Sequence, residues 1–283
     1  NLKPGMSTYD IDKIGEDFIR SHDCIPSFLN YHGYPASVCV SLNNEVVHGI
    51  PSRTRIIKEG DIVSLDAGVI YKGYHSDSAR THIVGEVSEE IKELVRVTRE
   101  SFFEGIKFAK EGYYIVDISR AIQNHCESHG FSLVRDLVGH GVGRELHESP
   151  EIPNFVGNRK GPKITAGMTL AIEPMVNIGR YDVEWLDDDW TVITEDGSMS
   201  AHYENTVLVT RGFSVYRSTD NGLRFQQTGP ITDNFLYRLQ SVDHSIFANG
   251  WDGRLYKSID DGKTWTSFLQ LGPSTHPLRI IKP

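Results

Sequence analysis

Two aspartates, Asp66 and Asp77, lie on either side of a predicted tight turn at Lys72-Gly73. β-branched and aromatic residues alternate on both sides of this turn, which predicts a β-hairpin. Centring the turn between Tyr71 and Lys72 places the two carboxylates opposite each other in the ladder, about 5 Å apart. Like charges this close repel each other unless a cation lies between them. The pattern therefore predicts either a divalent cation site or a solvated hairpin face.

The same strand pattern occurs a second time in the chain. A segment ending at Asp66 is repeated 107 residues later, where the equivalent residue is Glu173. The segment starting at Asp77 has a weaker counterpart 127 residues later, which starts at Glu204. Each copy then supplies two carboxylates at equivalent positions. We expect an α+β fold of two similar halves, related by a pseudo-twofold axis, whose acids converge on a shared site.

A histidine flanked by glycines, His140, lies between the two copies. Glycines carry no side chain that would shield it from a metal or a substrate, and a structural histidine is the alternative. One imidazole and four carboxylates are enough to hold two divalent ions with bridging carboxylates. Oxygen-rich ligands without thiolates favour Mn, Fe, Co or Zn in a catalytic site over a structural zinc. The predicted chemistry is metal-assisted hydrolysis of a carbonyl compound.

The elements around these motifs can also be predicted. Apolar residues at helical spacing indicate helices at about residues 8–21, 88–108 and 117–129. Ser7 opens the first with a capping-box pattern, and Ser88 is the expected N-cap of the second. Two β-rich runs around Asn43-Asn44 predict a further hairpin within residues 36–47.

Composition limits the classes of function. The chain has 283 residues, enough for one or two domains, and a net charge of -9, which argues against a nucleic-acid partner. Its three cysteines form no C-x-x-C pair, which favours reduced thiols and a cytoplasmic location. No run of about 18 apolar residues occurs, so no membrane partner is expected. Because the chain starts at Asn1 and ends abruptly at Pro283, we expect a fragment.

Six motifs together resemble type I methionine aminopeptidases. They are Val47-His48-Gly49-Ile50-Pro51, Leu65-Asp66-Ala67-Gly68, Ser76-Asp77-Ser78-Ala79-Arg80-Thr81, Gly139-His140-Gly141-Val142-Gly143, Ile172-Glu173-Pro174-Met175 and Tyr203-Glu204-Asn205-Thr206. They occur in the order and spacing of that family, from about residue 2 to residue 210. The resemblance implies the pseudo-twofold "pita-bread" fold and a metallo-aminopeptidase catalytic domain in residues 1–210.

The resemblance also implies roles for single residues. It makes the metal ligands Asp66, Asp77, His140, Glu173 and Glu204, with Asp77 and Glu204 bridging the two ions. Glu173 is implied as the acid and base for the attacking water. His48 and His147 match family histidines that contact the substrate backbone and stabilise the tetrahedral intermediate.

A pocket for the methionine side chain is implied as well. Its expected walls are Phe28, Tyr31, Tyr34, Cys39, Leu146 and Trp190. Cys39 is expected to be a wall rather than a nucleophile, because no base accompanies it at a readable spacing. Three departures from the family pattern stand out: a helix usual before Leu2 is absent, Leu146 replaces a common aromatic, and the last ligand lies in His202-Tyr203-Glu204-Asn205.

A different repeat begins after Thr210. The pattern Tyr-x-Ser-x-Asp-x-Gly-x-x-aromatic starts at Tyr216 and again forty residues later at Tyr256. It resembles the sialidase-type Asp-box, or BNR, repeat, in which the acid and the glycine form a turn of a propeller blade. We expect residues 211–283 to be a short all-β segment of incomplete blades, because two blades cannot close a propeller.

The main functional hypothesis is removal of the N-terminal methionine from nascent proteins and peptides with a small second residue, by attack of a metal-bridging water or hydroxide. The partner would be the N-terminal peptide, met at the ribosome, and the enzyme is expected to be a monomer. Alternatives are an Xaa-Pro aminopeptidase on the same fold, a binding protein that has lost catalysis, and a fragment of a larger binding protein with an Asp-box propeller.

Overall fold

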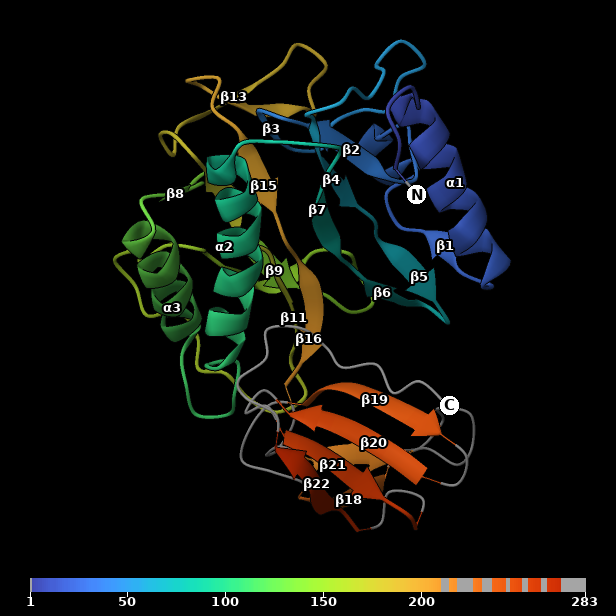
Figure 1. The fold of residues 1–283 in the computed structure, drawn as a ribbon. Coiled ribbons are helices and arrows are strands. Elements are labelled where there is room, and N and C mark those ends of the chain that lie inside the picture. Colours follow the sequence, from blue (N-terminus) through green and yellow to red (C-terminus); the bar gives the residue numbers. More distant parts are fainter. Residues whose placement is uncertain are drawn as a thin grey trace. The chain divides into compact units, whose positions relative to one another are not determined.

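The computed structural model describes residues 2–209 and, further along the chain, residues 214–217, 226–230, 236–242, 245–250, 254–260 and 264–270. The chain divides into two compact units, Asn1–Val209 and Thr210–Pro283 (Figure 1). Each unit is described below by itself. Within the described residues, no helix is long and apolar enough to cross a membrane.

The first unit contains helices and short antiparallel strands. Its helices are α1 (Thr8–Ser21), the 3-10 turn η1 (Tyr31–Gly33), α2 (Glu89–Ile106) and α3 (Ile115–Ser128). Its strands are β1 (Ile25–Pro26), β2 (Cys39–Leu42), β3 (Glu45–Val47), β4 (Ile62–Asp66), β5 (Val69–Tyr71), β6 (Tyr74–Ser76), β7 (Ala79–Ile83), β8 (Ser132–Leu133), β9 (Gly139–Gly141), β10 (Glu148–Ile152), β11 (Thr169–Ile172), β12 (Met175–Asn177), β13 (Val183–Trp185), β14 (Val192–Thr194), β15 (Ser200–His202) and β16 (Asn205–Leu208). The sheet orders are β2-β4-β7, β1-β5-β6, β10-β9-β11-β16, β15-β12-β8 and β13-β14-β3. Figure 1 shows α1 on one side of these strands and α2 and α3 on the other.

The helices follow the sequence pattern closely. Helix α1 has the predicted bounds, and the Ser7 hydroxyl accepts a hydrogen bond from the Asp10 N–H at 3.1 Å. Ser88 caps α2 in the same way, by accepting from the Ile91 N–H. Helix α3 begins at Ile115, two residues before the predicted start at Asp117. Asp117 is the third helical residue rather than the cap, and its carboxylate accepts from the Tyr114 N–H.

The predicted opposition of Asp66 and Asp77 is wrong by two residues. Asp66 pairs with Ala79 in the β4-β7 ladder, so the turn is centred between Lys72 and Gly73. Both turn residues have positive φ, 51° and 80°, which matches the twist of the flanking strands as a type I′ turn does. Asp77 therefore lies in the break between β6 and β7 rather than across the ladder from Asp66.

The second predicted hairpin is also only partly correct. Strands β2 and β3 do flank Asn43-Asn44, and Asn43 has φ 59°. They belong to different sheets, however, since β2 pairs with β4 while β3 pairs with β14. The chain turns at this point and passes from one sheet to another.

The two halves of the first unit meet along a pair of short segments that begin at Asp77 and end at Thr206. The Thr206 N–H donates to the Asp77 carbonyl at 3.0 Å, and the Glu204 N–H donates to the Ala79 carbonyl at 2.9 Å. At the offset of 127 residues, Asp77 is equivalent to Glu204 and Ala79 to Thr206, so these two hydrogen bonds are equivalent to each other. A pseudo-twofold axis therefore passes between the segments, and it brings Asp77 and Glu204 together.

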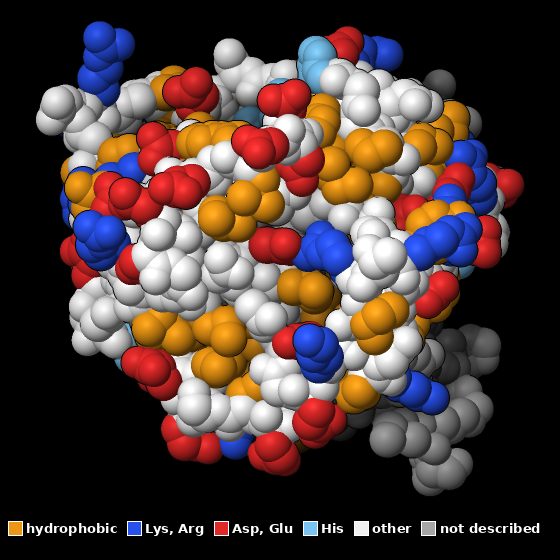
Figure 2. All heavy atoms as spheres, turned by 90° about the horizontal axis from the view of Figure 1, so that it is seen from above, with side chains coloured by type: hydrophobic (Ala, Val, Ile, Leu, Met, Phe, Trp, Pro, Cys, Tyr) orange, Lys and Arg blue, Asp and Glu red, His pale blue; other side chains and the backbone are white. Residues whose placement is uncertain are grey.

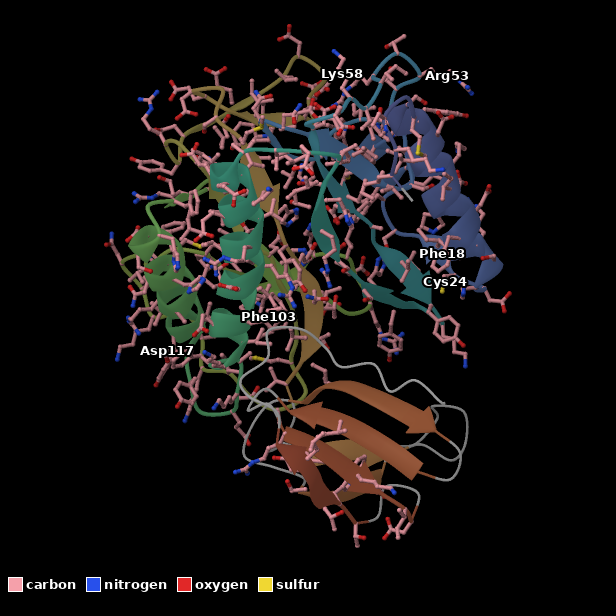
Figure 3. All side chains as sticks on the ribbon, viewed as in Figure 1. Phe18, Cys24, Arg53, Lys58, Phe103 and Asp117 are labelled. Atoms are coloured by element: carbon pink, nitrogen blue, oxygen red, sulfur yellow. The ribbon has the colours of Figure 1, made fainter. Side chains whose placement is uncertain are left out.

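The main apolar core lies in the half that contains α2 and α3. It includes fully buried Leu94, Ile118 and Ile122 from the two helices and Leu170 and Ile172 from β11. Helix α1 is less covered. Phe18, labelled in Figure 3, is 65% exposed, whereas its repeat equivalent His125 on α3 lies 3.6 Å from Glu100 of α2. Figure 2 shows Lys and Arg side chains scattered over one face of the molecule rather than gathered.

The described part of the second unit is all β. Its strands are β17 (Ser214–Arg217), β18 (Gln226–Pro230), β19 (Leu236–Val242), β20 (Ser245–Gly250), β21 (Arg254–Ser258) and β22 (Thr266–Gln270), in the orders β17-β18 and β19-β20-β21-β22. In the second predicted Asp-box, the Asp260 carboxylate accepts hydrogen bonds from Ser258 and Thr264. Most of the first box, residues 218–225, lies outside the described residues.

Candidate metal centre

The five predicted metal ligands come from both halves of the first unit. Asp66 ends β4, Asp77 lies between β6 and β7, and His140 is the middle residue of β9. Glu173 directly follows β11, and Glu204 lies between β15 and β16. Ala171 pairs with His140 across the β9-β11 ladder, which fixes the imidazole close to the end of β11.

The structure brings these five side chains together. One ligand atom each from Asp77, His140 and Glu204 lie within 4.8 Å of one another. His140 Nε2 is 3.5 Å from Glu173 Oε1. Asp66 interacts with Asp77 through a hydrogen bond between the carboxyl groups and also senses the charge of Glu173. Because a cluster of carboxylates and one imidazole at this spacing suits a divalent cation, the residues fit the predicted ligand set.

Burial makes this cluster electrostatically costly without a cation. Burial raises the pKa of Asp77 to about 6 and also raises the pKa values of Asp66, Glu173 and Glu204, whose charges add to the effect. Oδ1 of Asp66 and Oε1 of Glu204 are buried and have no hydrogen-bond partner. Buried carboxylates are normally paired or bound to metal. The orphaned oxygens are therefore available as metal ligands.

The orientation of His140 is fixed by its neighbours. Its Nδ1 is 2.8 Å from the Gly141 carbonyl, so Nδ1 carries the proton and Nε2 is left unprotonated as a ligand on the side of Glu173. The flanking glycines do not expose the imidazole, as the sequence suggested, because His140 is only 8% exposed. They allow close strand packing instead. A Cβ at Gly139 would clash with the Ala171 carbonyl, and one at Gly141 with the Ser149 carbonyl.

The two other predicted histidines lie near this centre. The His147 ring is 4.2 Å from the His140 ring, between centroids, and its Nδ1 is 2.7 Å from the Tyr31 hydroxyl. Desolvation lowers the pKa of His147 to about 4, and other histidines, His140 first, add to the shift. Burial likewise lowers the pKa of His48 to about 4. Both imidazoles are thus neutral near pH 7 and keep one N–H donor each.

The six predicted pocket residues share one apolar cluster. Phe28, Tyr34, Cys39 and Leu146 are buried in it, and Tyr31 and Trp190 pack against it. The Tyr34 and Trp190 rings meet edge to face at 5.1 Å. Cys39 pairs with Asp66 in the β2-β4 ladder, so the cluster adjoins the metal ligands. Burial and the nearby Asp66 raise the pKa of the Cys39 thiol, which keeps it neutral.

His202 was not singled out from the sequence. It is 2% exposed, and its Nε2 lies 3.7 Å from Glu173 Oε2. Neither ring nitrogen has a hydrogen-bond partner within the described part of the chain. Burial lowers the pKa of His202 to about 3, so the ring is neutral. The only sequence signal for it was its place two residues before Glu204.

Arg80 also has a larger part in the site than its motif suggested. Its guanidinium donates to the Ala79 and Glu204 carbonyls and to Asn205 Oδ1, and it stacks on the Tyr203 ring at 4.0 Å. It thereby fixes the backbone that carries Glu204.

Comparisons with known proteins agree with this geometry. The model of metallopeptidase family M24 matches residues 1–211. A methionine aminopeptidase of Clostridium acetobutylicum is 54% identical over 207 residues, which are 73% of this chain and 83% of that protein. The crystal structure of methionine aminopeptidase from Thermotoga maritima is 48% identical and superposes with a TM-score of 0.72, covering 74% of this chain and 84% of that one. A prolidase from Pyrococcus furiosus, 22% identical with a TM-score of 0.56 over 75% of this chain and 55% of its own, shares the fold.

These matches all cover the unit that contains the five ligands, and they identify its architecture as the pita-bread fold. The curated relatives are similar at high identity over more than two thirds of their own length. Divalent metal ions are the cofactor of this family, and the buried Asp77, His140 and Glu204 are placed to bind them. The chain belongs to metallopeptidase family M24, among the methionine aminopeptidases.

Proposed function

We propose that this chain removes the N-terminal methionine from peptides and nascent proteins with a small second residue. The observation that carries the proposal is the convergence of four carboxylates and His140 beside an apolar cluster that contains Cys39 and Leu146. A hydrolytic centre next to an apolar pocket suits a substrate with an unbranched apolar side chain at its cleavable end.

The ligands for the metal ions are Asp66, Asp77, His140, Glu173 and Glu204. Asp77 and Glu204 are related by the pseudo-twofold axis, which makes them the candidates for bridging two ions. When bound, divalent ions polarise the scissile carbonyl and lower the pKa of water towards neutrality.

The side chains around the ligands have complementary tasks. Glu173 is the proposed base and acid, because its carboxyl is buried beside His140 and His202 and its pKa is raised towards the range useful for proton transfer. His147 is oriented by Tyr31. If the Tyr31 hydroxyl donates to Nδ1, the proton of the neutral imidazole is on Nε2, where it can donate to the substrate carbonyl. His48 is the proposed second donor to the substrate backbone.

The pocket determines which N-terminal residue is accepted. An apolar pocket discriminates by size and gives about 10–200-fold preference per methylene. The proposed walls are Phe28, Tyr31, Tyr34, Cys39, Leu146 and Trp190. The Xaa-Pro aminopeptidase alternative has only the shared fold of a prolidase in its favour.

One experiment separates the two substrate classes. Purified protein is freed of metal, reloaded with Mn, Co, Fe or Zn, and offered Met-Ala-Ser and Ala-Pro-Ser as a pair. We expect release of methionine from the first peptide only, and only with metal. Cleavage of the proline peptide in preference to the methionine peptide would favour the alternative.

For the rest of the chain we propose a cytoplasmic, monomeric enzyme that meets its substrates as they leave the ribosome. Unpaired Cys24, Cys39 and Cys126 support a reducing compartment. We further propose that the second unit contains Asp-box repeats. The turn at Asp260, whose pKa is lowered to about 2 chiefly by hydrogen bonds from Thr264, supports this assignment.

A further inference from the structure

A second cavity lies in the first unit, and neither the proposed reaction nor its substrate uses it. It has a volume of about 150 Å³ and is lined by residues of β7, α2 and the segment around Tyr203. Because a water molecule occupies about 30 Å³ in the liquid, the cavity has room for several waters or one tetrahedral oxyanion.

Its lining is basic. Arg80 and His82 come from β7, Arg99 comes from α2, and His202 and Tyr203 come from the end of β15 and the residue after it. No carboxylate is among the described residues that line it. This is unusual in a chain with a net charge of -9, since acidic side chains outnumber basic ones. Two guanidinium groups without a carboxylate between them favour an anion.

The two arginines are held in place by aromatic rings. Arg80 stacks on Tyr203 at 4.0 Å, and Arg99 lies over Phe103 at 5.1 Å. These rings contact each other, with centroids 5.9 Å apart, so both cations are positioned by one aromatic group (Phe103 is labelled in Figure 3). Burial and, to a smaller extent, the charge of Arg99 lower the pKa of Arg80. An anion between them would relieve this unfavourable environment.

His202 adds a buried donor to the same cavity. Its ring nitrogens have no hydrogen-bond partner within the described part of the chain, and a neutral imidazole has one N–H to offer. The cavity thus combines two fixed cations with a buried, unpartnered polar side chain.

We propose that this cavity is a binding site for a small oxyanion of the size of phosphate, separate from the metal centre. The guanidinium groups of Arg80 and Arg99 supply the charge, and His202 supplies a neutral donor. The phosphate could be inorganic or a phosphoryl group of a larger molecule, and the test distinguishes these sources.

The test uses the full chain without metal, so that phosphate has no metal ions to bind. Thermal unfolding is followed in sodium phosphate and in sodium chloride at equal ionic strength, and ³¹P NMR line widths report binding directly. We expect phosphate to raise the melting temperature above that in chloride and to broaden in the presence of the protein. Repeating the measurement with adenosine monophosphate shows whether a phosphoryl group on a larger molecule also binds.

The decisive variant is Arg99→Met, with Arg96→Met as its control. Both remove one positive charge from α2, but Arg96 pairs with Glu93 and Glu100 on the helix surface and does not line the cavity. We expect Arg99→Met to weaken phosphate binding at least about fivefold and Arg96→Met to leave it unchanged.

Arg99→Lys is a second variant in case Arg99→Met fails to fold. It keeps the charge and the aliphatic stem but loses the planar fork, so binding should weaken by a smaller factor. The proposal is overturned if phosphate stabilises the metal-free chain no more than chloride does, or if the Arg99 variants bind it as well as the wild type. Because no metal or peptide is present, neither result bears on methionine release.

Discussion

Asp66, Asp77, Glu173 and Glu204 each raise or share the pKa shift of a neighbour, and all four are removed from water. Such an arrangement is unfavourable for ionised carboxylates alone, because neither solvent nor a nearby cation compensates them. The nearest guanidinium, Arg80, donates to the backbone carbonyl of Glu204 rather than to a carboxylate. The ligand residues are therefore arranged for a bound cation rather than for the stability of the fold.

Tyr31 has a role that a single substitution can test. Its hydroxyl fixes the tautomer and orientation of His147 through Nδ1. We expect Tyr31→Phe to lower kcat/KM for Met-Ala-Ser about fivefold, since one hydrogen bond that orients a donor contributes about 1 kcal/mol. Metal content and the melting temperature should stay unchanged. Steady-state kinetics with metal analysis of the same samples would measure this.

Tyr181→Phe is the matched control, because Tyr181 is an exposed tyrosine that stacks on Arg135. It should leave kcat/KM within twofold of the wild type. Equal rates for Tyr31→Phe and the wild type would show that His147 does not depend on this hydrogen bond.

The sequence predicted most single residues of the site but not their surroundings. The ligand types and their places in the repeat were readable because chemistry requires carboxylates and an imidazole there. His202 was missed because its closeness to Glu173 depends on how β15 packs beside β11 and β12, which no local pattern encodes. The role of the glycines beside His140 was misread for the same reason, since they contact strands that are distant in sequence.

At the scale of elements, turn chemistry decided the register. The sequence correctly placed Lys72-Gly73 at the bend, yet the residue count assigned the wrong opposing pair. Positive φ at both turn residues moves the centre of the hairpin by one residue and every pair by two. Asp77 nevertheless reaches the site, because hydrogen bonds to Thr206 position it from the other half of the unit.

The connection between β14 and β15 gives a prediction for pH dependence. The Asp196 carboxylate accepts hydrogen bonds from the Arg180 and Ser198 backbone N–H groups at 2.7 and 3.0 Å, and these lower its pKa to about 2. Since the folded pKa lies below the unfolded value, the unfolded chain binds the proton more readily. The stabilisation is therefore present above about pH 4 and is lost as the pH falls towards 2.

Urea unfolding of the wild type and Asp196→Asn would measure this effect. We expect the variant to be less stable by about 1 kcal/mol or less at pH 7, because the carboxylate is close to solvent. The difference should shrink as the pH is lowered from 4 towards 3. A difference that stays constant, or one that grows on acidification, would contradict the assignment.

At the scale of the whole molecule, the repeat was the most informative sequence feature. Its offset of 107 residues relates α1 to α3 end to end, and its offset of 127 relates the two segments that pair at the pseudo-twofold axis. The sequence could therefore predict two halves and a shared site. It could not predict the division of short strands among several sheets, because strand pairing is set by contacts between the halves.

The central claim is that dyad-related carboxylates hold the metal ions for methionine release, and Asp77→Asn tests it most directly. The change keeps the shape of the side chain, and the hydrogen bonds between the backbone of Asp77 and Thr206 remain possible. Asp187→Asn, at an exposed position, makes the same chemical change away from the site. For each protein, bound metal is counted after dialysis, and methionine release from Met-Ala-Ser is measured with the fold checked by circular dichroism.

We predict that Asp77→Asn folds, loses bound metal and releases methionine at least about 1,000-fold more slowly, because metal ions contribute several kcal/mol of transition-state stabilisation. Asp187→Asn should behave like the wild type in both measurements. A folded Asp77→Asn protein that binds metal and releases methionine at nearly the wild-type rate would contradict the account.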